Sequence, residues 1–310
     1  MRTATNSHEE PDFDWGPASQ AAASWSDDEI TDVHDKPIGS ILTETNRLGA
    51  GQVQKVLDYQ RKKGVRFGEA AVALRLVNED DVLFALSQQF HYPYAPHGRR
   101  DLSGELVAAV QPFGEQAEAF RALRSQLTMR QVVGGGSGRA LAVVSPECGE
   151  GKTFFAANLA ITLAQLGGST LLIDADLRNP RLHEVFSITD RAGLSGVLNG
   201  RQQANVIHQI PDLKSLYVLP VGVTPPNPLE LLERPAFGRL LLELIAKFDN
   251  VIVDTPAAQR GSDAGVIASR CGAALVVARR HQSRIGALQK LVTSLAESRA
   301  QLAGLVINEY

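Results

Sequence analysis

The residues whose types and spacing point most clearly to a chemical function follow a short apolar run and precede a stretch with helical apolar periodicity. They are Gly149, Glu150, Gly151, Lys152, Thr153 and Phe154. Glycines let backbone N–H groups approach phosphates, a lysine reaches the outer phosphates, and a hydroxyl holds Mg²⁺. A helix that starts here adds partial positive charge. The segment therefore predicts a phosphate-binding loop that takes ATP with Mg²⁺.

The match to the pattern G-x-x-x-x-G-K-[ST] is incomplete, because Pro146 stands where the first glycine is expected. The alternative is a glycine-containing turn from strand to helix that binds nothing. A GKT run in this strand–helix context favours the phosphate-binding loop.

Three aspartates are expected to converge on this loop. Asp174 and Asp176 end one apolar run, and Asp254 ends another. Ligands of open parallel sheets bind at the carboxyl ends of the strands, where residues two apart point to the same side. A helix cap would explain one such aspartate, but three carboxylates together would repel one another unless a cation relieves the repulsion. We therefore expect Thr153, Asp176 and Asp254 to hold Mg²⁺.

Further apolar runs alternate with helical patterns, and the additional predicted strands are residues 140–145, 215–222, 273–279 and 302–308. Such alternation is typical of a sheet that is covered by helices on both faces. The predicted fold class is α/β, a P-loop NTPase with a mostly parallel sheet flanked by helices, preceded by a small, mostly helical domain.

Composition divides the chain of 310 residues, of which 44% are hydrophobic. Residues 1–35 carry nine acidic residues and one basic residue, which predicts a disordered acidic tail. We expect the helical domain at residues 36–95, a linker rich in Pro, Gly and charge at 96–112, and the P-loop domain at 113–310. The sequence contains no apolar run of membrane-spanning length and starts with a polar segment, so a cytoplasmic protein is expected.

The helical domain contains an internal repeat. A shift of 29 residues places Gly39 on Gly68 and Gln60 on Gln89. Each copy reads as a short apolar turn, a polar break and an amphipathic helix. Asn78 is a good N-cap for the second helix, since acidic residues follow it.

The second copy, residues 66–89, resembles the N-terminal domain of type II secretion and pilus-assembly ATPases. A subset of those domains binds cyclic di-GMP, and the resemblance implies a cyclic di-GMP site built from Gln60, Arg66, Phe67, Gly68 and Gln89. The first copy has Pro37 where that subset has arginine, and Asn46 and Arg75 replace the glycines expected before the helices. The alternative is a docking or regulatory module that binds no ligand.

Residues 113–310 resemble the bacterial tyrosine kinases of polysaccharide export. The resemblance rests on the phosphate loop, on LLIDADLRNP at residues 171–180 and on VIVDTP at 251–256. It also rests on a Glu-x-x-Arg-x-x-Arg helix, which that family uses for subunit assembly and which here contains Glu118, Arg121 and Arg124. With the repeat in front, the chain is similar to the exopolysaccharide chain-length-determinant kinases.

This resemblance implies an ATP-dependent protein-tyrosine kinase that regulates exopolysaccharide chain length and export, gated by cyclic di-GMP if the repeat binds it. Lys152 would stabilise the transferred phosphoryl group, Asp174 would accept the tyrosine proton, and Asn308 would contact adenine. The implied partners are a membrane adaptor, which recruits the chain to the inner face of the membrane, and copies of the chain in a ring. Nucleic acid is not among them.

The terminal tyrosine cluster that such kinases phosphorylate on themselves is reduced here to Tyr310, the one candidate phosphosite near the end. Two alternatives stay open. One is an ATPase switch like the partitioning and division-site ATPases, although Glu147 stands where those have a signature lysine. The other is a non-catalytic, ATP-gated regulator of an export complex.

Overall fold

The structure is a computed structural model, and it describes residues 36–89, 102–134, 138–201, 205–211 and 213–309. The acidic tail predicted at residues 1–35 and the candidate phosphosite Tyr310 lie outside the described residues. None of the helices in the described ranges has the length and apolar character that crossing a bilayer requires.

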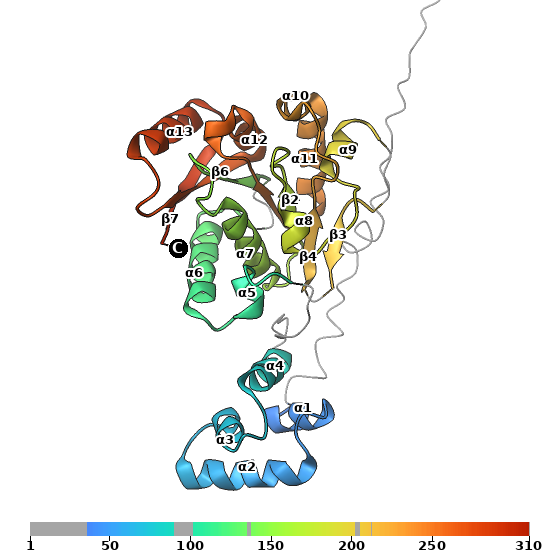
Figure 1. Cartoon of the computed structure of the whole chain (residues 1–310), viewed down its shortest axis with the longest axis vertical. Helices are drawn as coiled ribbons and strands as arrows, with labels where there is room; N and C mark the ends of the chain where they lie inside the picture. Colours follow the sequence, from blue (N-terminus) through green and yellow to red (C-terminus); the bar gives the residue numbers. More distant parts are fainter. Residues whose placement is uncertain (1–35, 90–101, 135–137, 202–204, 212, 310) are drawn as a thin grey trace, which may run out of the picture.

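The larger part of the chain is built on a seven-stranded sheet with the order β3-β4-β2-β5-β1-β6-β7 (Figure 1). The strands are β1 (Ala140–Val144), β2 (Thr170–Asp174), β3 (His208–Ile210), β4 (Leu213–Leu219), β5 (Asn250–Asp254), β6 (Gly272–Arg279) and β7 (Gln301–Asn308). All neighbouring pairs are parallel except the short edge strand β3, which pairs antiparallel with β4. The predicted α/β fold with a mostly parallel sheet is confirmed.

Alternate residues of the central strands face two separate cores. Leu172 and Ile252 pack in one with α7 (Lys152–Ala164) and α6 (Glu115–Met129). Their neighbours in sequence pack in the other, against helices on the opposite face (Figure 1). Burial on both faces explains why these strands read as continuous apolar runs.

The remaining helices of this part connect the strands. They are α8 (Leu182–Val185), α9 (Leu194–Leu198), α10 (Pro228–Glu233), α11 (Pro235–Lys247), α12 (Asp263–Cys271), α13 (Ile285–Glu297) and the 3₁₀ turn η3 (Ala258–Arg260). The segments that join β1 to α7 and β5 to α12 carry most of the side chains discussed below.

Part of the segment predicted as a linker is packed instead. Residues 90–101 lie outside the described residues, but α5 (Val107–Val110) is buried against α7. The side chain of Asn158 fixes it, since Oδ1 accepts a hydrogen bond from the backbone N–H of Ala108 at 2.9 Å and Nδ2 donates to the carbonyl of Glu105 at 2.9 Å. Within the stretch predicted as a linker, the apolar residues 106–110 are thus buried and pack against α7.

The N-terminal module consists of two helix pairs, α1 (Ile38–Glu44) with α2 (Ala50–Lys63) and α3 (Phe67–Ala73) with α4 (Glu79–Gln89). The repeat is thus present in the structure, with the difference that the predicted apolar turns are short helices. A core of its own lies between the pairs, with Leu42, Leu48, Val56 and Ala85 among its buried residues.

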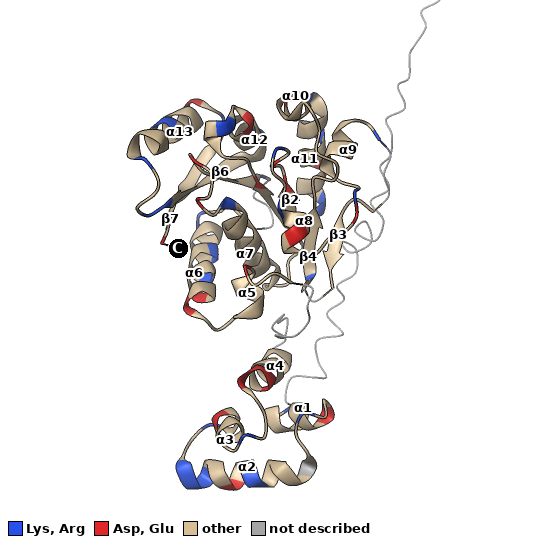
Figure 2. Ribbon diagram, in the orientation of Figure 1, with Lys and Arg blue, Asp and Glu red and all other residues tan. Residues whose placement is uncertain are grey.

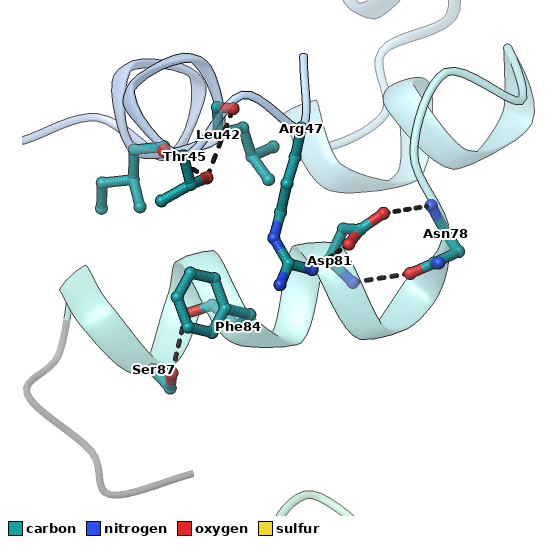
Figure 3. Close-up of polar contacts among 8 residues, drawn as sticks. Leu42, Thr45, Arg47, Asn78, Asp81, Phe84 and Ser87 are labelled. Atoms are coloured by element: carbon teal, nitrogen blue, oxygen red, sulfur yellow. Dashed lines mark hydrogen bonds and ion pairs between the residues drawn. The ribbon is translucent and has the colours of Figure 1, made fainter. Parts of the chain in front are cut away.

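One arginine joins the two copies of the repeat (Figure 3). Arg47, which follows α1, forms an ion pair with Asp81 of α4, and its guanidinium lies 4.5 Å from the centre of the Phe84 ring. Asp81 and Asn78 exchange hydrogen bonds through their side chains and backbone N–H groups, which is the predicted cap of α4. The Arg47 contacts connect α1 to α4 although the sequence separates them by more than 30 residues.

Candidate nucleotide-binding site

The loop between β1 and α7 has the backbone geometry that its glycines predict. Gly149 and Gly151 have φ angles of 77° and 98°, in the region that favours glycine. A Cβ on Gly151 would also lie 2.5 Å from Nδ2 of Asn308. Pro146 does not have a positive φ. The backbone therefore does not require glycine at this position, the first glycine of the phosphate-loop pattern.

Lys152 begins α7 and is buried, with 8% of its surface exposed. Its Nζ donates a hydrogen bond at 3.0 Å to Oγ of Ser145, the residue that follows β1. The N-terminus of a helix carries partial positive charge and attracts anions. The Lys152 ammonium group and the N-terminus of α7 thus place positive charge where a phosphate group could bind.

Asp254 is hydrogen-bonded to the loop hydroxyl. Thr153 Oγ1 donates to Asp254 Oδ2 at 2.6 Å, and Asp254 is 1% exposed. Burial raises the pKa of Asp254 to about 6, although the hydrogen bond from Thr153 and the charge of Lys152 oppose the shift. A hydroxyl and a carboxylate in contact at the end of the loop are the oxygen ligands that Mg²⁺ prefers.

Asp174 is fully buried and pairs with Asp254 across the β2–β5 ladder. Its oxygens accept hydrogen bonds from the backbone N–H groups of Asp176 at 3.2 Å, Arg181 at 3.1 Å and Leu182 at 3.0 Å. Burial raises its pKa well above the ordinary value, and the charge of Asp254 adds to the shift. The environment of Asp174 thus makes it a better proton acceptor than an exposed aspartate.

Asp176 lies just beyond β2 and is partly exposed. Its Oδ1 accepts from the backbone N–H groups of Arg178 at 3.2 Å and Asn179 at 2.9 Å, so the side chain closes the turn that follows the strand. Burial raises the pKa of Asp176, against the lowering effect of those hydrogen bonds and of Lys152 and Arg260. The charge of Lys152 thus acts on both Asp176 and Asp254, and that of Asp254 acts on Asp174.

In the described part of the chain, no three His, Cys, Asp or Glu side chains are arranged as a complete metal site. Thr153 and Asp254 nevertheless fit Mg²⁺, because a hydroxyl and a carboxylate are in contact beside a lysine and phosphate oxygens would supply further ligands.

Several contacts that support the loop were not predicted from the sequence. Glu150 is buried, accepts from the backbone N–H of Glu147 at 2.7 Å, and is hydrogen-bonded to Ser283 from the segment after β6. Arg279 donates to the carbonyl of Gly149 at 3.1 Å. Motif spacing has no signal for the contacts of Ser283 and Arg279, because 130 or more residues separate each from its partner in the loop.

Asn308 and Phe154, two residues predicted for the nucleotide site, lie next to the loop. Asn308 Nδ2 donates to the carbonyl of Glu150 at 3.1 Å. The Phe154 ring packs against Phe120 and Phe155, with ring centres 5.6 and 5.9 Å away. Phe154 and Asn308 both line a groove of about 340 Å³ between α6, α7 and β7, beside the loop.

The three residues expected to serve in assembly lie on α6, and all three have contacts within the chain. Arg121 pairs with Glu118 at 2.7 Å and donates to the carbonyl of Pro112 at 2.6 Å. Arg124 donates to the carbonyl of Thr162 at 2.7 Å. Glu118 has a side chain that is 71% exposed, so it is the member most accessible to a second copy.

The structure explains several repeat residues through packing. A Cβ on Gly68 would lie 2.5 Å from Cγ1 of Val82, and one on Gly39 would lie 3.0 Å from the Phe67 ring. Asn46 and Arg75, the residues that replace the expected glycines, both have φ 55°. Matching φ values in the two copies support the repeat alignment.

The other residues expected to bind cyclic di-GMP are spread over three helix ends. Arg66 is exposed at the N-cap of α3, where its backbone N–H donates to Glu69. Gln60 and Gln89 lie near the ends of α2 and α4 and are partly exposed.

Comparison with known proteins relates this chain to a nucleotide-binding domain family and to bacterial tyrosine-protein kinases. The family model for the CobQ/CobB/MinD/ParA nucleotide binding domain matches residues 141–310. Tyrosine-protein kinase YwqD of Bacillus subtilis is 32% identical over 203 residues, which are 66% of this chain and 85% of that protein. The kinase domain of Escherichia coli tyrosine kinase ETK superposes with a TM-score of 0.63 at 31% identity, covering 68% of this chain and 82% of that structure.

Other relatives are much longer than the matching region. Tyrosine-protein kinase wzc of Salmonella typhimurium is 30% identical over 210 residues, which are 68% of this chain and 29% of that protein. Across the longer curated relatives it matches, the chain spans 26 to 29% of their length. Sequence identity therefore relates this chain to one region of those proteins.

Proposed function

We propose that this chain, which belongs to the bacterial tyrosine-protein kinase family and carries a CobQ/CobB/MinD/ParA nucleotide-binding domain, transfers the terminal phosphoryl group of ATP to tyrosine. The observation that supports this most directly is the contact between Thr153 and the buried Asp254, next to Lys152 at the start of α7. These residues combine a hydroxyl, a carboxylate and an ammonium group at one end of the sheet. Phosphoryl transfer depends mainly on such positioning and charge.

Lys152 would bind the outer phosphates and stabilise charge on the transferred group. Thr153, Asp254 and Asp176 would hold Mg²⁺, which when bound neutralises phosphate charge. Asn308 and Phe154 would contact the nucleoside, since both line the groove beside the loop. Gly149, Glu150 and Gly151 would shape the loop around the phosphates.

Asp174 would accept the proton that leaves the tyrosine hydroxyl. Its buried position and the neighbouring charge of Asp254 raise its pKa, which strengthens it as a base. The three backbone N–H groups that it contacts keep the carboxylate in one orientation. Asp174→Asn should therefore reduce phosphoryl transfer more than it reduces nucleotide binding.

The partners follow from the resemblance to the polysaccharide-export kinases. We expect a membrane adaptor that recruits the chain to the inner face of the membrane, and a ring of copies in which α6 takes part. Glu118 supports the assembly role best, because its side chain is 71% exposed. Arg121 and Arg124 have intrachain contacts that a second copy would have to share or replace.

The decisive experiment incubates the full chain with Mg²⁺-ATP, with and without the cytoplasmic segment of its adaptor, and detects phosphotyrosine by mass spectrometry. Lys152→Ala is the inactive control, and Tyr310→Phe tests whether the terminal tyrosine is the acceptor. Phosphotyrosine in the wild type and its loss in Lys152→Ala supports the kinase. ATP hydrolysis without phosphotyrosine would instead identify an ATPase switch or a regulator that does not phosphorylate protein.

A second candidate function concerns the N-terminal module. The observation in its favour is the two-fold structural repeat with matching φ angles at Asn46 and Arg75. Basic residues gather at the C-terminal end of α2, next to the exposed Arg66, and would attract an anionic ligand (Figure 2). Phe67 and Gly68 are occupied in packing, so cyclic di-GMP binding rests on Arg66, Gln60 and Gln89.

Calorimetric titration of the full chain with cyclic di-GMP tests this second function, with Arg66→Ala as the comparison. Binding that weakens in the variant supports a nucleotide-gated kinase. An absence of heat at high micromolar ligand identifies the module as a docking element.

A further inference from the structure

An exposed arginine lies directly over the phosphate-binding loop. Arg260 is the last residue of η3, and its Nε donates a hydrogen bond to Sγ of Cys148 at 3.0 Å. Cys148 is itself exposed in the loop. A thiol is a weak hydrogen-bond acceptor, so this contact leaves the guanidinium ready to take a stronger one.

The turn that carries Arg260 is fixed to the loop by its backbone. The N–H of Ala258 donates to the carbonyl of Ser145 at 2.9 Å, and the N–H of Gln259 donates to the carbonyl of Pro146 at 3.0 Å. The position of the Arg260 backbone is therefore determined by the loop that is expected to bind the phosphates.

The same turn is connected to the aspartate side of the site. Gly261 has φ 148°, and a Cβ there would lie 2.9 Å from Oδ2 of Asp263. That carboxylate is buried and paired with Arg178 at 3.1 Å, and the backbone N–H of Arg178 donates to Asp176. Arg260 thus stands between the loop and the Asp176 turn, and its charge acts on Asp176.

Neighbouring arginines have stronger partners. In the described structure Arg279 donates to the carbonyl of Gly149, Arg280 pairs with Glu309 at 2.9 Å, and Arg284 pairs with Glu147 at 3.7 Å. The acceptor that the structure gives the Arg260 guanidinium is the Cys148 thiol. Of these four arginines, Arg260 would lose the weakest interaction if its guanidinium moved to contact a phosphate.

We propose that Arg260 is a catalytic residue that contacts the terminal phosphate of bound ATP and neutralises charge on the phosphoryl group during transfer. The inference rests on the proposed function and adds an exposed cation to the buried Lys152. A guanidinium can donate two parallel hydrogen bonds to phosphate oxygens, a geometry that lysine lacks. The Cys148 contact is exchanged for the phosphate when ATP enters, and no covalent bond changes at Arg260.

The test compares the affinities of the full chain for ADP and for a non-hydrolysable ATP analogue with Mg²⁺, by calorimetry. Arg260→Ala should weaken the affinity for the analogue by about 10- to 100-fold, the range expected for the loss of a charge-assisted hydrogen bond. The affinity for ADP should stay within about twofold of the wild-type value. Arg260→Lys should fall between wild type and alanine, because it keeps the charge and loses the paired donors. Because Arg260 is exposed, both variants should keep the thermal unfolding profile of the wild type.

Arg270→Ala is the matched control, since Arg270 is an exposed arginine on α12 whose contact is the carbonyl of Glu233. Arg270→Ala should change neither the affinity for ADP nor that for the ATP analogue. Equal weakening of ADP and the analogue in Arg260→Ala, or no change in either, would overturn the inference and leave the proposed kinase standing. If the folded wild type binds neither nucleotide, the proposed function fails with it.

Discussion

Asp174 and Asp254 are direct partners in the β2–β5 ladder, and both are buried at the carboxyl ends of their strands. Burial raises the pKa of each, and the charge of Asp254 raises that of Asp174 further. Without a cation, each carboxyl holds its proton to a higher pH than an exposed aspartate does. A divalent cation at Thr153 and Asp254 would favour the ionised forms, so the pair links proton binding to metal binding.

The first prediction concerns the stability of the ligand-free chain. The pKa of Asp254 is about 6 in the folded state, above its ordinary value of 3.8, so the native state binds the proton more tightly than the unfolded state. Stability therefore falls as the pH rises from 3.8 to about 6, and the cost is fully present above that window. Asp254→Asn should raise the unfolding temperature at pH 7.5 by about 2–4 °C, the shift that ~1 kcal/mol produces in a domain of this size.

Differential scanning calorimetry without nucleotide and Mg²⁺ measures this effect. The gain should shrink towards pH 4, where the wild-type carboxyl is protonated too. Glu297→Gln is the control, because it removes an exposed carboxylate of α13. A variant that is equally or less stable than wild type at pH 7.5 would show that burial of Asp254 carries no such cost.

The second prediction concerns the metal. If Thr153 Oγ1 and Asp254 hold Mg²⁺, Thr153→Val should abolish the increase in ADP affinity that Mg²⁺ gives, whereas Thr153→Ser keeps the hydroxyl and the increase. Titrating ADP with and without Mg²⁺ measures the two variants. We expect a difference of roughly tenfold or more between valine and serine, since one metal ligand is lost. Equal Mg²⁺ dependence in both variants would exclude Thr153 from the metal site.

The sequence predicted the parts of the site that a local motif or the end of an apolar run marks. Lys152 and Thr153 are adjacent, and Asp174 and Asp254 each end an apolar run that reads as a strand. Because parallel strands end at the same edge of a sheet, strand-end residues converge without any knowledge of side-chain contacts. The order of elements was therefore enough to place them.

The remaining features depend on pairings that a sequence does not encode locally. The link from Glu150 to Ser283 and that from Arg260 to Cys148 join residues more than 100 positions apart. The edge strand β3 has three residues, too few for a periodic pattern. The seven-residue helices α1 and α3 are equally short, which is why they read as apolar turns.

The third prediction concerns the reactivity of Cys148. Partial desolvation of this exposed thiol would raise its pKa, but hydrogen bonds to Arg260 and Gln259 and the charges of Arg260 and Lys152 give a net lowering. Arg260→Ala should therefore raise the pKa of Cys148 and slow its alkylation by iodoacetamide at pH 7.5, because the thiolate is the reacting form. Mass spectrometry against pH measures the rate, and the midpoint should move to higher pH in the variant.

Cys271 provides the internal control for alkylation, because it is buried and burial raises its pKa. It should stay unmodified in the folded chain, and its alkylation would report unfolding. Identical pH profiles of Cys148 in wild type and Arg260→Ala would show that the guanidinium does not act on the thiol.

The fourth prediction concerns the N-terminal module. Gly68→Ala places a Cβ 2.5 Å from Val82, between α3 and α4, and should destabilise the module by about 1–3 kcal/mol, as overpacking of a tight contact does. Gly51→Ala makes the same chemical change on α2, where a Cβ has no heavy atom within 4 Å. It should leave stability unchanged or raise it by up to ~1 kcal/mol, because alanine favours helix. Hydrogen exchange of the full chain, followed on peptides from α3 and α4, measures both.

The comparison between the two variants separates packing from ligand binding as the reason for glycine in the repeat. Faster exchange in Gly68→Ala and unchanged exchange in Gly51→Ala, both in the absence of nucleotide, would assign Gly68 to the contact between α3 and α4. If the two variants exchange alike, Val82 can move aside, and Gly68 would have to be explained by something that approaches its backbone from outside the module. The packing seen at Gly39 against the Phe67 ring favours the first outcome, since glycine permits close contact at the same position of both copies.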